Sequence, residues 1–259
     1  MAQTNRTIVI GDIHGCLVEL LRLLLEVNYV QGVDRLISVG DLMDRGPYPN
    51  AVVDFLQRLQ VEVLLGNHEE KHLRWLMYEM RKDRDPSFVN PCKLHPEYQD
   101  SSRKLSVENK VWLVCLPSFV RFEHAGKQWL VTHGGVPTDK PVEQQDRRKL
   151  CRCRFVNQDT GAYSSTHDPK QVPKNAVRWT ERWKGPESVV YGHIVHPSMQ
   201  IQDETVADGV RCIGIDTGCC FGGHLTAAVF DPAETQPYFV QVQAERAYKQ
   251  LRLGQDISD

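Results

Sequence analysis

The stretch LLGNHEEKHLRW, residues 64–75, contains two overlapping patterns of chemically active residues. From His68 it spells H-E-x-x-H, the zinc-protease pattern in which two histidines on one helix face bind the metal. From Gly66 it spells G-N-H-E, in which an apolar run ends at a glycine turn and then presents an amide and an imidazole. The second reading places His68 just after a strand, so we expect His72 to be a packed or solvated helix residue and not a zinc ligand.

Similar residue types recur wherever an apolar run of this chain ends. GDIHG follows RTIVI, GDLMDRG follows DRLISV, THGG follows QWLV, and YGH follows SVV. A single aspartate at such a break is explained by turn or helix-cap chemistry, but five breaks with metal-ligand types are not. The candidate residues are Asp12, His14, Asp41, Asp44, Arg45, Asn67, His68, His133 and His193.

These candidates divide into two groups that could each hold a metal ion. Asp12 and His14 could hold one ion, and a second ion could be held by Asn67, His133 and His193. Asp41 is the plausible bridge, because a carboxylate can offer one oxygen to each ion. Two ions about 3.5–4 Å apart clamp a phosphoryl group. Oxygen and imidazole ligands without a thiolate favour Mn²⁺, Fe or Zn²⁺ over a soft metal and do not choose among the three. The cofactors expected are two divalent metal ions, with Mn²⁺ taken first.

The elements that must position these residues follow a strand–loop–helix rhythm over the first 80 residues. The three predicted strands are RTIVI, DRLISV and VEVLL. Helix faces are predicted from Leu17, Leu20, Leu21 and Leu24, from Pro49 onward, and from Leu73, Leu76, Met77 and Met80. This rhythm predicts a βαβαβ unit with a parallel sheet whose strand ends gather the three breaks at one edge.

The remainder of the chain fits one domain over residues 1–259. Residues 81–110 are polar, carry three prolines and show no clear period, so we expect an insertion or lid that flanks the cleft. Short apolar runs then predict further strands, and residues 137–175 predict a second long surface segment.

Composition limits the classes of function. The net charge of −2 provides no global basic field, so neither a stable nucleic-acid partner nor a membrane partner is expected. Without an apolar run of about 18 residues or a signal peptide, the chain is expected in the cytoplasm, and its eight cysteines are expected to be free thiols.

The ordered motifs GDIHG, GDLMDRG, GNHE, THGG and YGH resemble those of the calcineurin-like metallophosphoesterases, in the phosphoprotein-phosphatase branch. The resemblance spans about residues 6–230. Within the family, the sequence is similar to the bacterial symmetrical dinucleoside tetraphosphatases and to the lambda-phage type of protein phosphatase. It implies an α/β fold with a central β-sandwich of mixed sheets flanked by helices.

The resemblance also implies a role for each matched residue. Asp12, His14 and Asp41 would bind one metal ion, and Asp41, Asn67, His133 and His193 would bind the other. His68 would protonate the leaving oxygen, oriented by Asp44, while Arg45 binds phosphate oxygens and metal-bound hydroxide attacks in line. A second phosphate-binding arginine is expected among Arg152, Arg154, Arg178 and Arg182, of which Arg178 and Arg182 lie in the better-matched stretch.

The predicted function is therefore metal-dependent hydrolysis of a phosphate ester or anhydride. The favoured substrate is a nucleotide such as diadenosine tetraphosphate, cleaved symmetrically. The alternative is a phosphomonoester on a protein or small molecule, as in a Ser/Thr phosphatase. A catalytically silent binding module would have lost a ligand or the acid, and this sequence retains all of them.

Overall fold

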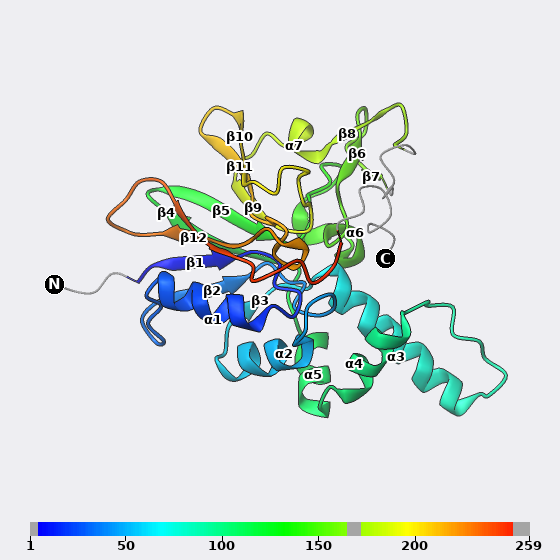
Figure 1. Cartoon of the computed structure of the whole chain (residues 1–259). Helices are drawn as coiled ribbons and strands as arrows, with labels where there is room; N and C mark the ends of the chain where they lie inside the picture. Colours follow the sequence, from blue (N-terminus) through cyan, green and yellow to red (C-terminus); the bar gives the residue numbers. More distant parts are fainter. Residues whose placement is uncertain (1–4, 165–171, 251–259) are drawn as a thin grey trace.

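In the computed structural model, two five-stranded sheets stack face to face, and helices cover the outer face of the first sheet (Figure 1). The structure describes residues 5–164 and 172–250. The ends of the predicted domain 1–259, and residues 165–171 of the predicted segment 137–175, lie outside the described residues.

The first sheet is built by the predicted strand–helix rhythm, and its order is β13-β12-β1-β2-β3. Strands β1, β2 and β3 run parallel, and β12 and β13 complete the sheet in antiparallel register. The three parallel strands therefore end at one edge, where the loops with the motifs begin. The elements are β1 (Thr7–Ile10), α1 (Leu17–Glu26), β2 (Arg35–Ser38), α2 (Pro49–Arg58), β3 (Glu62–Val63), β12 (His224–Phe230) and β13 (Tyr238–Gln243).

The second sheet has the order β10-β11-β9-β5-β4, with β5, β9 and β11 parallel to one another. Its strands are β4 (Phe119–His124), β5 (Lys127–Thr132), β9 (Ser188–Tyr191), β10 (Gln202–Ala207) and β11 (Val210–Gly214). A small third sheet flanks it and contains β6 (Phe155–Asn157), β7 (Tyr163–Ser164) and β8 (Ala176–Arg178). The predicted sandwich of mixed sheets is confirmed.

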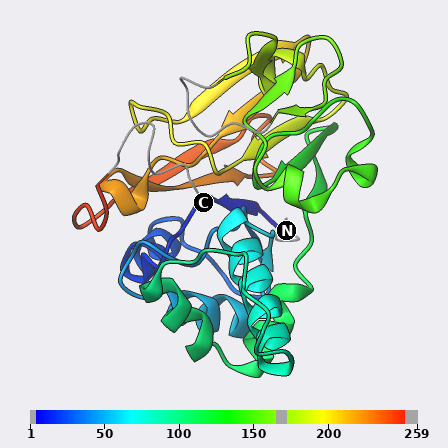
Figure 2. The ribbon, with the colours of Figure 1, turned by 90° about the vertical axis from the view of Figure 1, so that its right-hand side faces the viewer.

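Apolar layers cover both faces of the first sheet. Between the sheets, Val9 and Ile37 of the first sheet pack with Trp129, Val131 and Val190 of the second. On the other face of the first sheet lies a larger cluster that joins it to α1, α2 and α5 (Val107–Val114), and the helices lie below the strand layers in Figure 2. Burial of both faces of the first sheet explains why β1 and β2 are short apolar runs without alternation.

Two predicted helix faces differ from the structure. In α1 the predicted Leu21 is exposed, and Leu23 takes the buried place beside Leu20. In α3 (Asn67–Arg84) the predicted Met77 and Met80 are 70% and 57% exposed. The buried face of α3 instead lies in its first turns, and its later turns extend away from the sheets (Figure 1).

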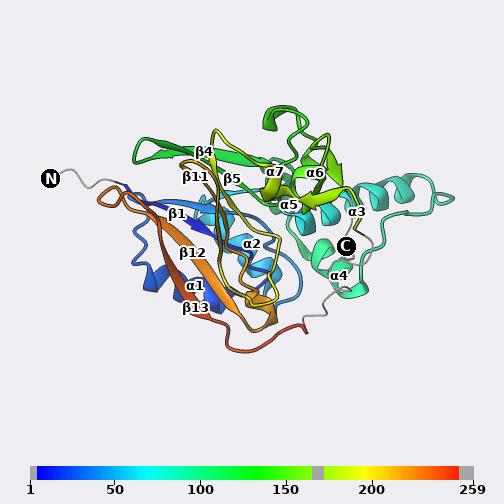
Figure 3. The same cartoon turned by 90° about the horizontal axis from the view of Figure 1, so that it is seen from above.

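The segment predicted as an irregular insertion at 81–110 is largely helical. It contains the end of α3, a loop, α4 (Pro96–Lys104) and the start of α5. Proline at the first position of α4 and the Ser106 hydroxyl that accepts from the Asn109 amide explain where these helices begin. Figure 3 shows α3, α4 and α6 (Arg147–Leu150) at the end of the molecule opposite the β4–β5 hairpin.

Within residues 5–164 and 172–250, the remaining elements are α7 (Trp179–Arg182) and 3₁₀ turns at Val142–Gln144 and Cys219–Phe221. Among the described helices, none is long and apolar enough to cross a membrane.

Candidate metal and phosphate site

Loops at the strand ends bring every predicted metal ligand to one buried region. Asp12 and His14 follow β1, Asp41 follows β2, and Asn67 opens α3 just after β3. The second sheet supplies His133 after β5 and His193 after β9. All six side chains are at most 7% exposed. Three of these residues, His14, Asp41 and His193, adopt positive φ, and so do Asp44 and Arg45 in the same loops. This conformation is costly for residues other than glycine, and it clusters at functional sites.

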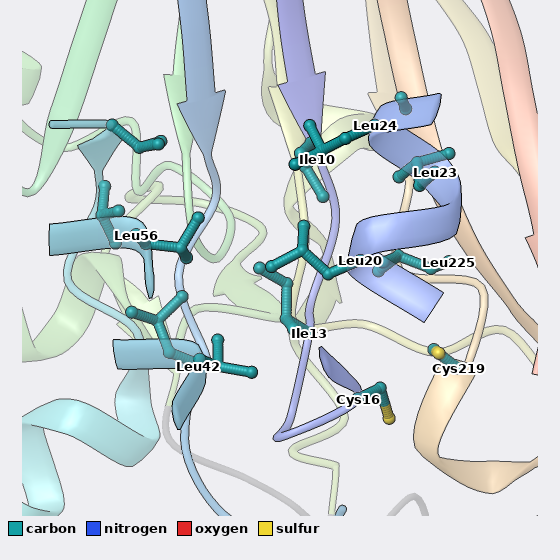
Figure 4. Close-up of a cluster of buried hydrophobic side chains, with 14 of the residues drawn as sticks. Ile10, Ile13, Cys16, Leu20, Leu23, Leu24, Leu42, Leu56, Cys219 and Leu225 are labelled. Atoms are coloured by element: carbon teal, nitrogen blue, oxygen red, sulfur yellow. The ribbon is translucent and has the colours of Figure 1, made fainter. Parts of the chain in front are cut away.

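Apolar residues between the ligands hold these loops against the core. Ile13 lies between Asp12 and His14 in the sequence, and Leu42 follows Asp41. Both are fully buried, and Figure 4 shows them directed into the cluster beneath the first sheet. The predicted ligands therefore face the strand-end edge, because the side chains of their neighbours are buried in the core.

Glycines bring the loops into close contact. A Cβ atom on Gly66 would lie 2.2 Å from Oδ1 of Asp41, and one on Gly192 would lie 2.1 Å from Oδ1 of Asp12. Only glycine fits at these two positions, which explains the glycines of GNHE and YGH.

Asp41 lies at the centre of the ligand cluster. Its Oδ2 is 3.4 Å from Nε2 of His14, and its Oδ1 is 3.3 Å from Nε2 of His133. Nε2 of His133 also lies 3.0 Å from Oδ1 of Asn67. Asp41 and His133 form a further group of potential ligands with His193. One carboxylate thus faces both predicted ligand groups with different oxygens.

In His14 and His133 the contact of the second ring nitrogen fixes the tautomer. Nδ1 of His14 donates to the Met43 carbonyl at 2.8 Å, and Nδ1 of His133 donates to the Val39 carbonyl at 2.9 Å. Each Nε2 is then an acceptor that points into the cluster, the arrangement usual for metal-binding histidines. Nε2 of His133 therefore faces two other acceptors, the oxygens of Asn67 and Asp41. A cation or a hydrogen-bond donor between them would satisfy all three.

The charges of the cluster also fit divalent cations. Burial raises the pKa of Asp12 well above its usual value, and the nearby carboxylates of Asp216 and Asp41 raise it further. Burial likewise raises the pKa of Asp216 to about 6. Three buried carboxylates in one cluster repel one another, and bound cations would remove that cost. The donor set of oxygens and imidazoles therefore fits two divalent ions.

His68 and Asp44 form a hydrogen-bonded pair beside the ligands. Nδ1 of His68 lies 2.7 Å from Oδ2 of Asp44, and Nε2 of His68 lies 3.9 Å from Oδ2 of Asp41. Burial opposes ionisation of Asp44, but hydrogen bonds from His68 and His72 outweigh it and lower its pKa. The ionised carboxylate orients the ring so that Nε2 faces the predicted metal ligands.

The residues of the H-E-x-x-H pattern bind the loop that follows β2 and do not form a zinc-protease site. Glu69 accepts hydrogen bonds from the backbone amides of Asp41, Leu42 and Met43, while His72 binds the same carboxylate as His68. The protease reading is therefore excluded by geometry. His72 is a packed helix residue, as expected, but its hydrogen bond to Asp44 was not predicted.

Arginines occupy the site differently from the sequence-based expectation. Nη1 of Arg45 lies 2.7 Å from Nε2 of His14, and Nε of Arg154 donates to Nε2 of His193 at 3.2 Å. Burial lowers the pKa of Arg154 to about 10, which leaves it charged at neutral pH. Arg152 donates to the Asn67 carbonyl at 3.1 Å.

The two arginines favoured from the sequence lie elsewhere. Arg178 is paired with Glu204 on the surface, and Arg182 lines a separate pocket with Arg121 and Glu187. The structure thus places Arg154, not Arg178 or Arg182, against the ligand cluster. Both arginines belong to the segment around α7. This helix packs on the outer side of the second sheet, where Trp179 and Trp183 are part of a buried apolar cluster.

Sequence reasoning missed two residues of the site. Asp216 follows β11 in the motif IDTG, so it carried the same strand-end signal as the other aspartates. Glu69 stands in the GNHE motif, but its hydrogen bonds to the amides of the Asp41 loop are long-range contacts that the motif does not indicate.

Comparison with known proteins agrees with this geometry. The family model described as calcineurin-like phosphoesterase matches residues 6–225. The chain therefore belongs to the calcineurin-like phosphoesterase family, and it is a metallophosphoesterase, a hydrolase of phosphate esters or anhydrides.

Individual relatives cover nearly the whole chain. A symmetrical bis(5'-nucleosyl)-tetraphosphatase of Yersinia enterocolitica is 27% identical and covers 92% of this chain and 93% of its own. A crystal structure that carries the provisional description of a diadenosine tetraphosphatase matches with a TM-score of 0.72 and 29% identity, covering 93% and 94% of the two chains. A yeast serine/threonine phosphatase shares the fold, with a TM-score of 0.55, 14% identity and coverage of 94% and 81%.

Proposed function

We propose that this protein hydrolyses dinucleoside tetraphosphates symmetrically, so that diadenosine tetraphosphate and one water give two molecules of ADP. The observation that carries the proposal is a basic pocket beside the ligand cluster, described below. It is supported by relatives named for this activity that match over more than nine-tenths of both chains.

The proposed metal ligands are those expected from the sequence. Asp12, His14 and Asp41 hold one ion, and Asp41, Asn67, His133 and His193 hold the other, with Mn²⁺ as the favoured metal. When bound, the ions neutralise phosphate charge and activate water.

The residues around the ions complete the proposed chemistry. Arg45 and Arg154 bind the oxygens of the attacked phosphate, because their guanidinium groups already lie against His14 and His193. His68, held by Asp44, donates a proton from Nε2 to the oxygen of the departing nucleoside diphosphate.

The basic pocket has a volume of about 710 Å³ and lies next to this site. Arg152 lines it and also donates to the Asn67 carbonyl, so one guanidinium joins the pocket to a proposed metal ligand. The carboxylate of Glu70 pairs with three arginines at once, Arg74, Arg148 and Arg152, at 3.2, 3.0 and 2.6 Å. The pocket residues are Lys71, Arg74, Pro91, Cys92, Lys93, Asp146, Arg148, Lys149, Arg152 and Tyr163.

The charge of this pocket favours a polyphosphate over a monoester. Six of its lining residues are cationic and one, Asp146, is acidic. One carboxylate cannot neutralise three arginines, so the pocket retains a positive field that suits the remaining phosphates of the chain. We propose that the leaving nucleoside diphosphate lies there.

The experiment is product chromatography after incubation of the Mn²⁺-loaded protein with diadenosine tetraphosphate, beside p-nitrophenyl phosphate. ADP as the sole product supports the proposal. Release of nitrophenol without nucleotide cleavage would overturn it and leave the phosphomonoesterase alternative.

A charge-removing pair tests the pocket. Lys93→Ala with Lys149→Ala should raise the KM for diadenosine tetraphosphate about 10-fold or more and leave p-nitrophenyl phosphate turnover unchanged, because each lost cation weakens a charged contact. Lys127→Ala, on the exposed β4–β5 hairpin, is the matched control. An unchanged KM would remove the pocket from the substrate path.

We further propose that the chain forms one domain, with residues 81–110 flanking the cleft, and that it acts in the cytoplasm without a stable nucleic-acid partner. All eight cysteines are free, as a reducing compartment requires, and the net charge is −2. The partners we propose are its phosphorylated substrates.

A further inference from the structure

Asp44 is held by two histidines of one helix, and each histidine takes a different carboxylate oxygen. Nδ1 of His68 lies 2.7 Å from Oδ2, and Nε2 of His72 lies 2.8 Å from Oδ1. His72 is fully buried, and its Nδ1 contacts the hydroxyl of Ser102, which is also fully buried on α4. We infer that His72 and Ser102 are positioning residues for phosphoester hydrolysis, which act through Asp44 on the proton donor His68.

The two hydrogen bonds fix the rotation of the Asp44 carboxylate. A carboxylate with one partner can turn about its Cβ–Cγ bond, whereas one held at both oxygens cannot. The plane of Asp44 in turn sets the direction of the His68 ring, whose Nε2 must point at the leaving oxygen. Losing the contact at Oδ1 therefore loosens the donor without touching the substrate.

Ser102 selects the tautomer of His72. A neutral imidazole that donates from Nε2 to Asp44 has Nδ1 as its acceptor. The Ser102 hydroxyl contacts Nδ1. In that tautomer the hydroxyl is the donor of this bond. Without the hydroxyl, the ring can place its proton on Nδ1 and then presents an acceptor to the carboxylate, which breaks the contact.

The helix that carries Ser102 is fixed in place by other contacts. Nδ2 of Asn50 in α2 donates to the Ser101 carbonyl at 3.0 Å, and the Tyr98 ring of α4 lies 6.4 Å from the His72 ring. The segment predicted as an insertion thus supports the proton donor His68 indirectly, through Ser102, His72 and Asp44.

A purely structural role for His72 would also satisfy these hydrogen bonds, and substrates with different leaving groups separate the two roles. Phenyl phosphate needs its leaving oxygen protonated, whereas 2,4-dinitrophenyl phosphate does not. A positioning role predicts a selective loss on phenyl phosphate. A structural role predicts equal losses on both substrates, or loss of folding.

The test compares His72→Phe, His72→Gln and Ser102→Ala, each checked for folding and metal content. His72→Phe should lower kcat on phenyl phosphate by about 10- to 100-fold and change kcat on the dinitrophenyl ester by less than about 3-fold. His72→Gln retains an amide donor and should recover much of the loss. Ser102→Ala should show the same selectivity, and Ser101→Ala is its matched control.

Equal losses on both esters, or no loss in His72→Phe and Ser102→Ala, would overturn the inference. If His72→Phe fails to fold, His72→Gln and Ser102→Ala still decide. The inference rests on the proposed acid role of His68 but not on the nucleotide substrate. His68→Asn distinguishes failure of that acid role from failure of the inference alone. If His68→Asn shows no selectivity, the acid role fails and the inference with it; if only His68→Asn is selective, the inference alone is wrong.

Discussion

Replacing Glu69 with glutamine tests how the loop after β2 is held. Oε1 accepts from the amides of Leu42 and Met43 at 2.9 and 3.1 Å, and Oε2 accepts from those of Asp41 and Gly66 at 2.9 and 3.2 Å. Glutamine has one oxygen, so two of the four buried amides would face an NH₂ group. At about 1–3 kcal/mol for each unsatisfied donor, Glu69→Gln should lower the free energy of unfolding by about 2–6 kcal/mol.

Urea unfolding followed by circular dichroism measures this change. Glu62→Gln is the control, because Glu62 forms a surface pair with Arg35 whose removal should change stability by less than about 1 kcal/mol. Glu69→Gln should also weaken metal binding, since Asp41 lies in the freed loop. A loss in Glu69→Gln no larger than that in Glu62→Gln would refute the reasoning.

Three further predictions concern the acid, the arginines and the pH dependence of stability. His68→Asn should lower turnover of poor leaving groups by about 100-fold and spare good ones, as steady-state kinetics on aryl phosphates would show; equal losses would argue against proton donation. Arg154→Ala should weaken competitive inhibition by inorganic phosphate about 10-fold or more, whereas Arg178→Ala should not, and the reverse order would restore the sequence-based choice. Burial raises the pKa of Asp34, but its pairing with Arg6 outweighs burial and lowers it, so the stabilisation exists above the unfolded pKa of about 3.9 and is lost as the pH falls through the folded value. Asp34→Asn should therefore cost about 1–3 kcal/mol at pH 7 and progressively less below about pH 4 in urea titrations, and a difference independent of pH would contradict this.

The strand ends could be predicted from the sequence because local chemistry determines them. An apolar run followed by Gly-Asp or Gly-Asn needs few distant contacts to be interpreted, and parallel strands bring such ends together. Asp12, Asp41 and Asn67 were found in this way. The sandwich of two sheets followed from the family resemblance rather than from periodicity.

The remaining features depend on contacts between segments far apart in the chain. His72 could not be assigned to Asp44 because its partners lie 28 and 30 residues away. Arg154 was one of four candidate arginines and could not be preferred, because its burial against His193 is a tertiary property. Arg178 and Arg182 were favoured by local similarity. Met77 and Met80 fitted a helical period but lie on turns of α3 that extend beyond the core.

The most direct test of the central claim is the metal content of the protein and of Asp41→Asn, measured by mass spectrometry after loading with Mn²⁺, together with hydrolysis of p-nitrophenyl phosphate. Asp41 is the one residue placed between both ligand groups. The account predicts two ions per chain in the wild type, fewer than two in Asp41→Asn, and loss of turnover in the variant. Full occupancy and full activity in Asp41→Asn would contradict it.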